Sequence, residues 1–365
     1  MALTPPVVSV VMASYNHAPF IREAITSVLA QDVDLELLVA DDGSTDPTAD
    51  IARSIQDPRL QVTAHAQNRG ACVVTNELIS RSRGQYIAIM NSDDVWKPAK
   101  LQTQLAVLAE HPECIASFGA AEFIDRAGKL IPRESQSSHY RDIFNKKNRS
   151  RGQWLRFFFE HGNCLCHPTL LIRSQAYQDI GLYDNRYRQF PDFDLWIRLL
   201  KHHEIHVSPE FFISFRLLPG ENASSMTPKN LVRMENELYT LASKFFDHIP
   251  DDCLRDVFAD LMRHPGLTTP QHKTIETALL LLSPHSTSRP IFSLAGLMAL
   301  FQLLGDAALE DLLQTEYGLT ARDLHDKMAE IDTLRRPDLN ALSRSSGYDV
   351  LRELTKRIRA RLRPG

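Results

Sequence analysis

The sequence lacks the glycine-rich loops that hold phosphates in many nucleotide enzymes. No GxGxxG follows the first predicted strand, and no GxxxxGK[ST] occurs anywhere in the 365 residues. The first loop binds dinucleotides and the second binds the phosphates of P-loop NTPases. The sequence therefore argues against both classes of enzyme, and any bound diphosphate has to be held by other groups.

Cysteine is also sparse. The chain has five cysteines, an odd and scattered set that argues against a disulfide framework and fits a reducing compartment. The run Cys164-Leu165-Cys166-His167 resembles half of a zinc site, but no second pair of ligands follows at zinc-site spacing. We therefore expect these side chains to be packed in the core.

An excess of positive charge is absent as well. The net charge is −4, the sequence pI is about 6.4, and 43% of residues are hydrophobic. A broad nucleic-acid-binding face needs a basic excess, so no nucleic-acid partner is expected. The most apolar stretch, residues 291–305, is shorter than the ~20 residues that span a bilayer and predicts a buried helix. With no signal-peptide pattern, a cytoplasmic location is expected.

Continuous apolar segments alternate with helical patterns in the first half of the chain. Strands are predicted at 7–12, 35–40, 59–64 and 85–90, and helices at 19–29, 44–55 and 71–82, with Ser44 or Thr45 as a helix cap and Gly84 as a helix stop. A helix opened by Pro98 follows. This alternation predicts an α/β fold with a mostly parallel sheet covered by helices on both faces.

The predicted secondary structure changes after the first half of the chain. Residues 132–153 are polar and charged and predict an irregular excursion. A second α/β section is expected as a strand at 168–173, helices at 175–180 and 192–202, and a strand at 205–215. From residue 228 onward only helical patterns remain, which predicts an all-α C-terminal region.

Polar side chains follow three of the predicted strands. They are Ser14-Tyr15-Asn16, Asp41-Asp42 and Asn91-Ser92-Asp93-Asp94. Because ligands of such sheets gather beyond the carboxyl ends of the strands, these residues are expected at one site. Adjacent aspartates can cap a following helix, or they can hold a divalent cation that binds a diphosphate. Several acids in one cleft need a compensating cation or hydrogen-bond donors, which favours the second interpretation.

Five segments, in this order along the chain, resemble the family 2 inverting glycosyltransferases of the GT-A fold. They are VSVVMASYNHAPFIREAITSVLAQ, LELLVADDGSTD, NRGACVVTN, GQYIAIMNSDDVWKPAKL and PDFDLWIRL, and the resemblance covers about residues 5–218. It implies a GT-A domain over residues 1–225, nucleotide-binding to about 120 and acceptor-binding over about 121–225. A helical C-terminal region over residues 226–365 follows.

The resemblance also implies a reaction. A sugar moves from a nucleoside-diphosphate sugar, expected to be UDP-linked, to a hydroxyl of a saccharide or lipid-linked acceptor, with inversion. Mn²⁺ or Mg²⁺ would serve as cofactor, and the product would belong to a cell-surface polysaccharide or glycoconjugate.

Matching positions give the expected nucleotide-sugar site. Ser14, Tyr15 and Asn16 match the loop whose aromatic residue packs on the nucleobase, and Asp42 matches the acid that accepts from the base edge. Arg69 could reach a phosphate or could be a solvated turn residue.

The segment from Asn91 to Asp94 matches the Asp-x-Asp region of the family. Asp93 aligns with the acid that coordinates the metal, and Asn91 stands where many relatives have aspartate, so it would contribute a neutral oxygen to ribose or metal. Asp94 would support this site or cap the next helix.

Asp192 aligns with the general base, in a segment where Pro191 replaces the usual glutamate. Inversion requires a base opposite the leaving diphosphate, and a carboxylate can take the proton of the acceptor hydroxyl. Asp194 is the rival base, but two residues apart on a helix the two side chains point in different directions. Arg216 is a further candidate for contact with the diphosphate.

The sequence leaves two alternative functions open, and its last residues could form a membrane-binding surface. A nucleotidyltransferase would also use acids and a metal, and a degenerate transferase domain could bind sugar nucleotides without catalysis. The stretch 350–365 places Leu351, Leu354, Ile358 and Leu362 at helical spacing among basic residues. Such a helix can lie on an anionic membrane, so peripheral contact with the inner face of the membrane is an expectation of the sequence.

Overall fold

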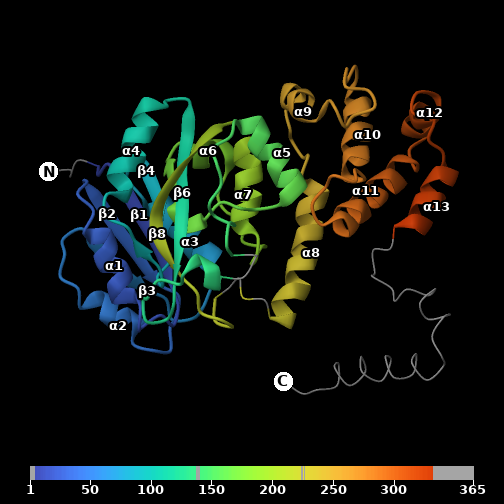
Figure 1. The fold of residues 1–365 in the computed structure, drawn as a ribbon. Helices are drawn as coiled ribbons and strands as arrows, with labels where there is room; N and C mark the ends of the chain where they lie inside the picture. The colour runs from blue at the N-terminus through green and yellow to red at the C-terminus, as the bar shows by residue number, and fades with distance from the viewer. Residues whose placement is uncertain (1–4, 137–139, 223–224, 226, 332–365) are drawn as a thin grey trace, which may run out of the picture.

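The computed structural model describes residues 5–136, 140–222, 225 and 227–331. Within these residues a single eight-stranded sheet has the order β3-β2-β1-β4-β7-β6-β8-β5 (Figure 1). The strands are β1 (Val8–Ser14), β2 (Leu35–Asp41), β3 (Leu60–Ala64), β4 (Tyr86–Ile89), β5 (Val95–Trp96), β6 (Cys114–Ile124), β7 (Leu171–Arg173) and β8 (Glu204–Arg216).

The sheet is parallel in one half and mixed in the other. β1 runs parallel to β2 and β4, and β2 runs parallel to β3. β7 is antiparallel to β4 and β6, whereas β6 and β8 run parallel. The carboxyl ends of β1, β2 and β4 therefore lie at one edge of the sheet, which we call the carboxyl edge.

Helices cover both faces of the sheet. Side chains that alternate along β1 point to opposite sides, so Val10 and Met12 pack in the cluster that contains α1 (Ile21–Leu29) and α4 (Lys100–Glu110). Val11 packs in the second cluster, which contains α3 (Ala71–Arg81), α5 (Arg151–His161), α6 (Ala176–Ile180) and α7 (Pro191–Leu200). The short α2 (Thr48–Arg53) packs on the first side through Ala52.

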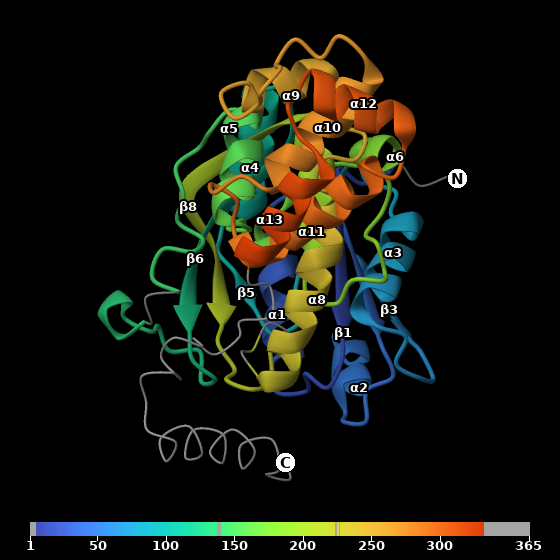
Figure 2. The same ribbon diagram turned by 90° about the vertical axis from the view of Figure 1, so that its right-hand side faces the viewer.

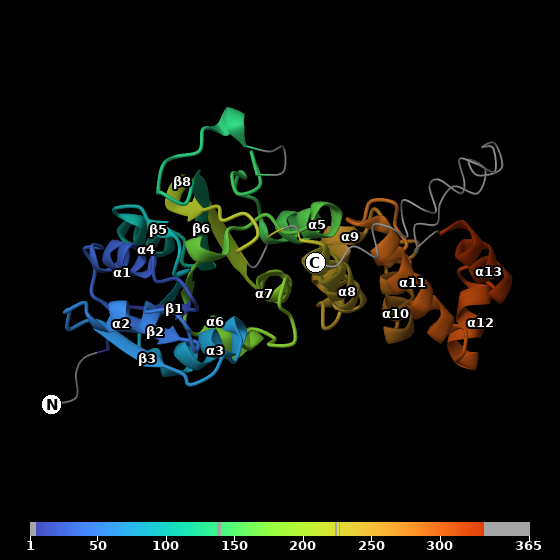
Figure 3. The ribbon, with the colours of Figure 1, turned by 90° about the horizontal axis from the view of Figure 1, so that it is seen from below.

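The described residues of the C-terminal region form helices and the loops between them, with no strand. The helices are α8 (Pro228–Lys244), α9 (Asp251–Phe258), α10 (Pro270–Leu281), α11 (Arg289–Leu303), α12 (Ala307–Thr315) and α13 (Ala321–Glu330). Figure 2 views the molecule from the side of these helices, with the sheet behind them. Figure 3 shows α8, then α10 and α11, then α12 and α13, following one another away from the sheet.

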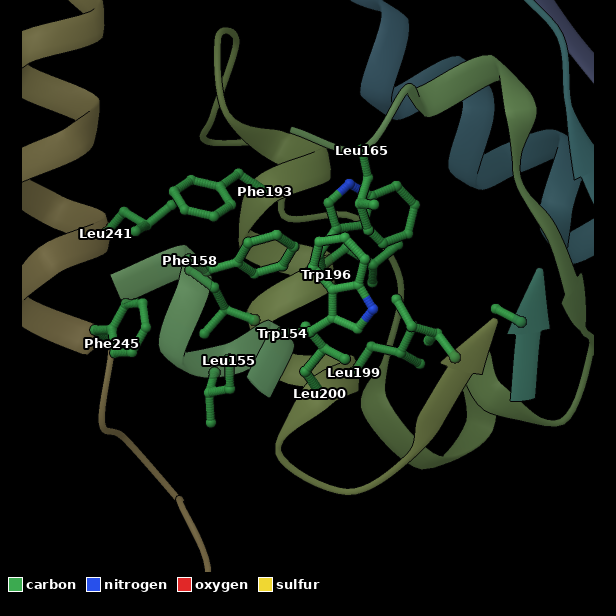
Figure 4. Close-up of a cluster of buried hydrophobic side chains, with 14 of the residues drawn as sticks. Trp154, Leu155, Phe158, Leu165, Phe193, Trp196, Leu199, Leu200, Leu241 and Phe245 are labelled. Carbon is green, nitrogen blue, oxygen red and sulfur yellow. The ribbon is translucent and has the colours of Figure 1, made fainter. Parts of the chain in front are cut away.

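The core does not stop where the helical region begins. Leu241 of α8 and Phe245, directly after α8, pack in the same buried cluster as Phe158 of α5 and Phe193 of α7 (Figure 4). Phe159 of α5 meets the rings of Phe245, Phe246, Phe258 and Phe292 with centroids 5.4 to 5.7 Å apart. The division at residue 225 stays a prediction, and one hydrophobic core crosses it.

Several local predictions from the sequence were wrong. Neither Ser44 nor Thr45 caps α2, which begins at Thr48 with Asp46 accepting the Thr48 amide. Gly84 does not end α3; the backbone of Ser9 passes so close to it that a Cβ there would lie 2.4 Å from the Ser9 nitrogen. The helix α5 begins inside the segment expected to be irregular, because Ser150 and Gln153 form a capping box.

The apolar stretch 291–305 forms most of α11, as predicted, with Phe292 and Ala295 buried. Among the described residues no single helix is long and apolar enough to cross a membrane; α11 and α12 meet that test only together, with a bend of 110° between them. The basic stretch 350–365 lies outside the described residues.

Candidate functional site

The loops after β1 and β2 are tied together by Asn16. Its amide donates to the Ser44 hydroxyl over 2.8 Å, and its side-chain oxygen accepts from the Thr45 amide over 2.8 Å. Asn16 has a φ of +53°, a left-handed conformation that asparagine tolerates better than most residues. Ser14 is buried beside Asp41, whereas the Tyr15 side chain is 43% exposed at the carboxyl edge. This exposed ring is free to stack on a flat ligand.

Asp42 organises the loop between β3 and α3. Its two carboxylate oxygens accept from the backbone amides of Arg69 and Gly70, over 2.7 and 2.9 Å. The Arg69 guanidinium lies 2.7 Å from Glu77 and remains half exposed. Asp42 is therefore buried and holds the loop from which Arg69 projects.

The acids after β4 are buried together. The Asp94 carboxylate accepts from the Arg216 amide over 2.7 Å and from the Asn91 side chain over 2.9 Å. Asp93 is 7% exposed, and one of its oxygens accepts from Asn222 over 3.2 Å. Asp94 caps no helix, because α4 begins after Ala99 without a side-chain cap.

Burial raises the pKa values of this pair. Burial raises the pKa of Asp93, an effect that the nearby His17 and Arg216 oppose. Burial also raises the pKa of Asp94 well above its usual value, and the neighbouring charge of Asp93 raises it further. Two adjacent carboxyls of this kind resist full ionisation unless a cation compensates them.

Arg216 supports this loop, and its side chain is only 1% exposed. Nε donates to the Asp93 carbonyl, Nη1 donates to the carbonyls of Asp125 and Arg126, and Nη2 pairs with Glu23 over 2.6 Å. The prediction that Arg216 contacts a diphosphate was wrong, because its guanidinium is buried among protein acceptors.

His17 was not singled out from the sequence. Its Nδ1 lies 2.7 Å from the Ser92 hydroxyl, which joins the loop after β1 to the loop after β4. The Phe20 and Ile21 amides donate to its carbonyl at the start of α1. A lone histidine in a sequence carries no signal of this position, because its partner lies 75 residues away.

Asp192 stands at the start of α7. One oxygen accepts from the Phe193 amide over 2.8 Å and the other from the Asn163 side chain over 2.9 Å. Burial raises its pKa to about 6, partly opposed by these hydrogen bonds. Asp194 points elsewhere and pairs with Arg198 over 2.8 Å. A carboxyl that titrates near neutrality, with no cationic side chain bonded to it, suits a general base.

Two cysteines connect Asp192 with the other acids. Burial raises the pKa of Cys166 well above its usual range, and the charges of Asp94 and Asp192 raise it further, so both acids lie near this thiol. Burial and the charge of Asp192 raise the pKa of Cys72 to about 11, and Cys72 lies two residues beyond Gly70, which binds Asp42. Asp94 and Asp192 are thus neighbours of the same thiol, and Asp192 also lies near the start of α3, which follows the loop that Asp42 binds.

His167 belongs to the core. Its Nε2 lies 2.8 Å from the Tyr183 hydroxyl, and burial lowers its pKa to about 4. With Cys164 and Cys166 also buried and unpaired, the expectation of packed side chains is met and no zinc site forms among the described residues.

The fit of a divalent cation can be judged from the donors present. No group of three or more histidine, cysteine, aspartate or glutamate side chains able to hold a metal occurs in the described part of the chain. Mg²⁺ and similar cations commonly use one or two carboxylates and take further oxygens from substrate phosphates. Asp93, whose carboxylate accepts from one neighbouring side chain, that of Asn222, among the described residues, fits this open arrangement.

Comparison with known proteins gives one family. The model of glycosyl transferase family 2 matches residues 9–174. TuaG of Bacillus subtilis, a glycosyltransferase provisionally assigned to teichuronic acid biosynthesis, is 33% identical over 54% of this chain and 73% of its own. An uncharacterized glycosyltransferase of Rickettsia prowazekii is 31% identical over 60% of this chain and 67% of its own.

Solved structures match over a larger part of the chain. S. aureus TarS (residues 1–349), in complex with UDP-GlcNAc, has a TM-score of 0.55 at 17% identity and covers 90% of this chain and 91% of that one. The mannosyltransferase PcManGT of Pyrobaculum calidifontis, in complex with GDP-Man and Mn²⁺, has a TM-score of 0.51 at 16% identity, with 90% and 86% covered. The predicted fold class, a GT-A domain followed by a helical region, is confirmed.

Proposed function

This chain belongs to glycosyl transferase family 2, and we propose that it transfers a sugar from a nucleoside-diphosphate sugar to an acceptor hydroxyl with inversion. One observation carries the proposal. Asp192 is held at the start of a helix with a pKa of about 6, and it shares a neighbour, the Cys166 thiol, with Asp94 of the loop after β4. A base and a pyrophosphate-binding group are the two parts that such a reaction needs.

The donor would lie along the carboxyl edge. We assign the nucleobase to the exposed ring of Tyr15 and to Asp42, with Ser14 and Asn16 shaping the loop beneath it. Arg69 would approach the phosphates after leaving Glu77. Asn91 retains its side-chain oxygen for the ribose, since its amino group is bonded to Asp94. UDP-linked sugars remain the expected donors.

Asp93 would hold Mn²⁺ or Mg²⁺, with Asp94 behind it. When bound, the cation supplies positive charge that stabilises the departing diphosphate. The binding of GDP-Man and Mn²⁺ by PcManGT supports this assignment. Arg216 contributes indirectly, because it fixes the backbone on either side of Asp93.

Asp192 would accept the proton of the acceptor hydroxyl as its oxygen attacks the anomeric carbon. The attack comes from the face opposite the leaving diphosphate, so the configuration inverts without a covalent enzyme intermediate. The assignment of TuaG to teichuronic acid biosynthesis supports a saccharide or lipid-linked acceptor in polysaccharide synthesis. A cytoplasmic enzyme, with peripheral membrane contact, is part of the same proposal.

A donor screen tests the function. The full chain is incubated with Mn²⁺ and a panel of UDP-, GDP- and dTDP-sugars, and release of nucleoside diphosphate is measured, with Asp192→Asn as the paired control. We expect slow hydrolysis of one donor by the wild-type chain and none by the variant. Thermal stabilisation by a donor without any release would instead identify a sugar-nucleotide-binding protein. Release of inorganic pyrophosphate from a nucleoside triphosphate and a sugar phosphate would identify a nucleotidyltransferase.

A further inference from the structure

Asn163 follows directly after the end of α5. Gly162 terminates this helix with a φ of +81°, and its amide donates to the Phe158 carbonyl over 3.0 Å. Glycine adopts this left-handed conformation at little cost, so the chain turns sharply here. The turn directs the next residue, Asn163, toward the start of α7.

The orientation of the Asn163 amide is fixed by its two partners. Its Oδ1 accepts from the Leu165 backbone amide over 3.1 Å, and its Nδ2 donates to Asp192 over 2.9 Å. A backbone amide can only donate and an ionised carboxylate can only accept, so the reverse orientation would lose both bonds. Asn163 therefore presents a donor to the ionised form of Asp192.

We propose that Asn163 is a positioning residue for the base, holding the Asp192 carboxylate in the orientation that receives the acceptor's proton. The inference rests on the proposed function, since it takes Asp192 as the base. With one oxygen on the Phe193 amide and the other on Asn163, the carboxylate is held at both ends. The lone pairs that neither donor uses remain for the substrate.

The packing of α5 against α7 supports the bond between Asn163 and Asp192. The rings of Phe158 and Phe193 meet edge to face with centroids 5.3 Å apart, and Phe193 is the residue next to Asp192. On its other side α5 is held by the C-terminal helices through Phe159, and the Thr287 amide donates to the Phe159 carbonyl over 2.7 Å. A residue on such rigid supports can fix a catalytic group.

Three titratable neighbours of Asp192 lie on different segments, and burial raises the pKa of each: Cys72, Cys166 and Tyr183. These two thiols and this phenol stay neutral where Asp192 titrates. Asp94 also lies near Cys166 and has a raised pKa, so the titration of Asp192 has to be followed on its own assigned signal. The bond from Asn163 lowers the pKa of Asp192 and so opposes the effect of burial. Loss of this bond should therefore raise the pH at which Asp192 becomes a base.

Asn76 offers a matched control. Its side chain also bridges two segments, donating to the Tyr183 carbonyl over 2.7 Å and accepting from the Tyr183 amide over 3.1 Å. It is half-buried like Asn163, and it makes no bond to Asp192. Asn76→Ala therefore removes a comparable amide bridge in the same part of the fold without touching the base.

The experiment compares wild type, Asn163→Ala, Asn163→Asp and Asn76→Ala. Asn163→Asp keeps the shape and the bond to Leu165 but replaces the donor by an acceptor, so it serves even if Asn163→Ala folds poorly. For both Asn163 variants we expect kcat to fall about tenfold or more, part of the roughly 10²- to 10⁴-fold that a general base contributes. The acid limb of the pH profile should move to higher pH, with KM for the donor little changed. Asn76→Ala should keep the wild-type acid limb.

A second readout does not need turnover. The carboxyl carbon of Asp192 is followed by NMR over pH 4 to 8 in ¹³C-aspartate-labelled protein, with Asp192→Asn used to assign its signal. A higher pKa in both Asn163 variants than in wild type supports the inference, whereas unchanged titration and an unchanged acid limb overturn it. If wild type transfers no sugar from any donor, the proposed function fails. The titration then still decides whether Asn163 controls the Asp192 carboxyl.

Discussion

The backbone amide of Arg216 donates to the side chain of Asp94 over 2.7 Å and so ties the end of β8 to the loop after β4. The guanidinium of the same residue donates to the Asp93 carbonyl over 2.8 Å. Residues 122 positions apart in the sequence thus fix the position of the candidate metal ligand. The geometry of Asp93 depends on a side chain that never needs to touch the substrate.

Replacing Arg216 by methionine should destabilise the protein. The change keeps much of the volume but leaves the carbonyls of Asp93, Asp125 and Arg126 without their donor. We expect a loss of roughly 2–4 kcal/mol in the free energy of unfolding, measured by urea denaturation. Arg126→Ala is the control, because its pair with Glu221 is exposed and should contribute less than about 1 kcal/mol. Equal effects of the two variants would contradict a supporting role for Arg216.

Replacing Asp192 should abolish most sugar transfer, whereas replacing Asp194 should not. Asp192→Asn should lower transfer at least about 100-fold, because the amide cannot accept the proton. Donor binding should remain within about twofold of wild type, because the carboxylate meets only the acceptor. Asp194→Asn weakens the pair with Arg198 and should mainly reduce stability. Steady-state kinetics with the donor found by the screen measure both; wild-type turnover by Asp192→Asn would exclude it as the base.

The pKa of Asp192 predicts how rate and stability respond to pH. Transfer should decline as the pH falls below about 6, because the base becomes protonated. The contribution of Asp192 to the free energy of unfolding changes in the opposite direction with pH. The folded pKa lies above the unfolded one, so the contribution to stability is complete below about pH 4 and is lost as the pH rises through 6.

Asp192→Asn should consequently raise the melting temperature at pH 8 but not at pH 4.5. Calorimetry at the two pH values checks this, since the neutral amide removes a cost that exists only when the carboxyl is ionised. A gain of the same size at both pH values would show that burial does not destabilise the ionised form of Asp192.

Asp93→Ala should remove the cation-dependent part of nucleotide binding. Mn²⁺ and UDP together should stabilise the wild-type chain against heat by mass action, about 2.7 kcal/mol at a ligand concentration 100 times Kd. The variant should lose this gain, because its one protein carboxylate for the cation is gone. Uridine lacks the diphosphate and provides the control ligand. Stabilisation of Asp93→Ala by Mn²⁺ and UDP at the wild-type level would place the cation elsewhere.

Phe159→Ala should loosen the C-terminal helices from α5. The side chain is fully buried and contacts four other phenylalanines, so the cavity should cost about 3–5 kcal/mol. Phe301→Ala, on a side chain that is 58% exposed, should change stability by less than about 0.5 kcal/mol. Chemical denaturation measures both, and hydrogen exchange in α8, α9 and α11 should rise only in the first variant.

The parallel half of the sheet was predictable from the sequence because its strands are continuous runs of apolar residues. Beyond β7, the strand β8 was predicted at 205–215, but β6, which lies between β7 and β8, was not. β6 reads CIASFGAAEFI, with small residues where β-branched ones would signal a strand, and Gly119 is there to admit the ring of Phe212 from β8. No local sequence pattern predicts that Gly119 makes room for Phe212, since the two residues meet only in the folded sheet.

The candidate site divides in the same way. Asp42 and Asp93 follow apolar strands, so their position along the chain was enough to single them out, whereas Asp192 was singled out by the match of its segment to a family motif. Asn163 and His17 were missed because only the folded structure brings each to its partner. Asn163 bonds Asp192, and His17 bonds Ser92. The prediction that Arg216 contacts the diphosphate was wrong because its guanidinium is buried and bonded to other protein groups.

The continuity of the core across residue 225 limits how this protein can be rebuilt. Chimeras that exchange the tail of one transferase for another would break inside a packed phenylalanine layer if cut at that point. A shortened catalytic fragment would show that layer to water and should precipitate. The distal helices α10–α13 add a second cluster of their own, but α10 and α11 also pack in the main core through Leu281 and Phe292, so a crossover directly beyond α9 would cut the same core again.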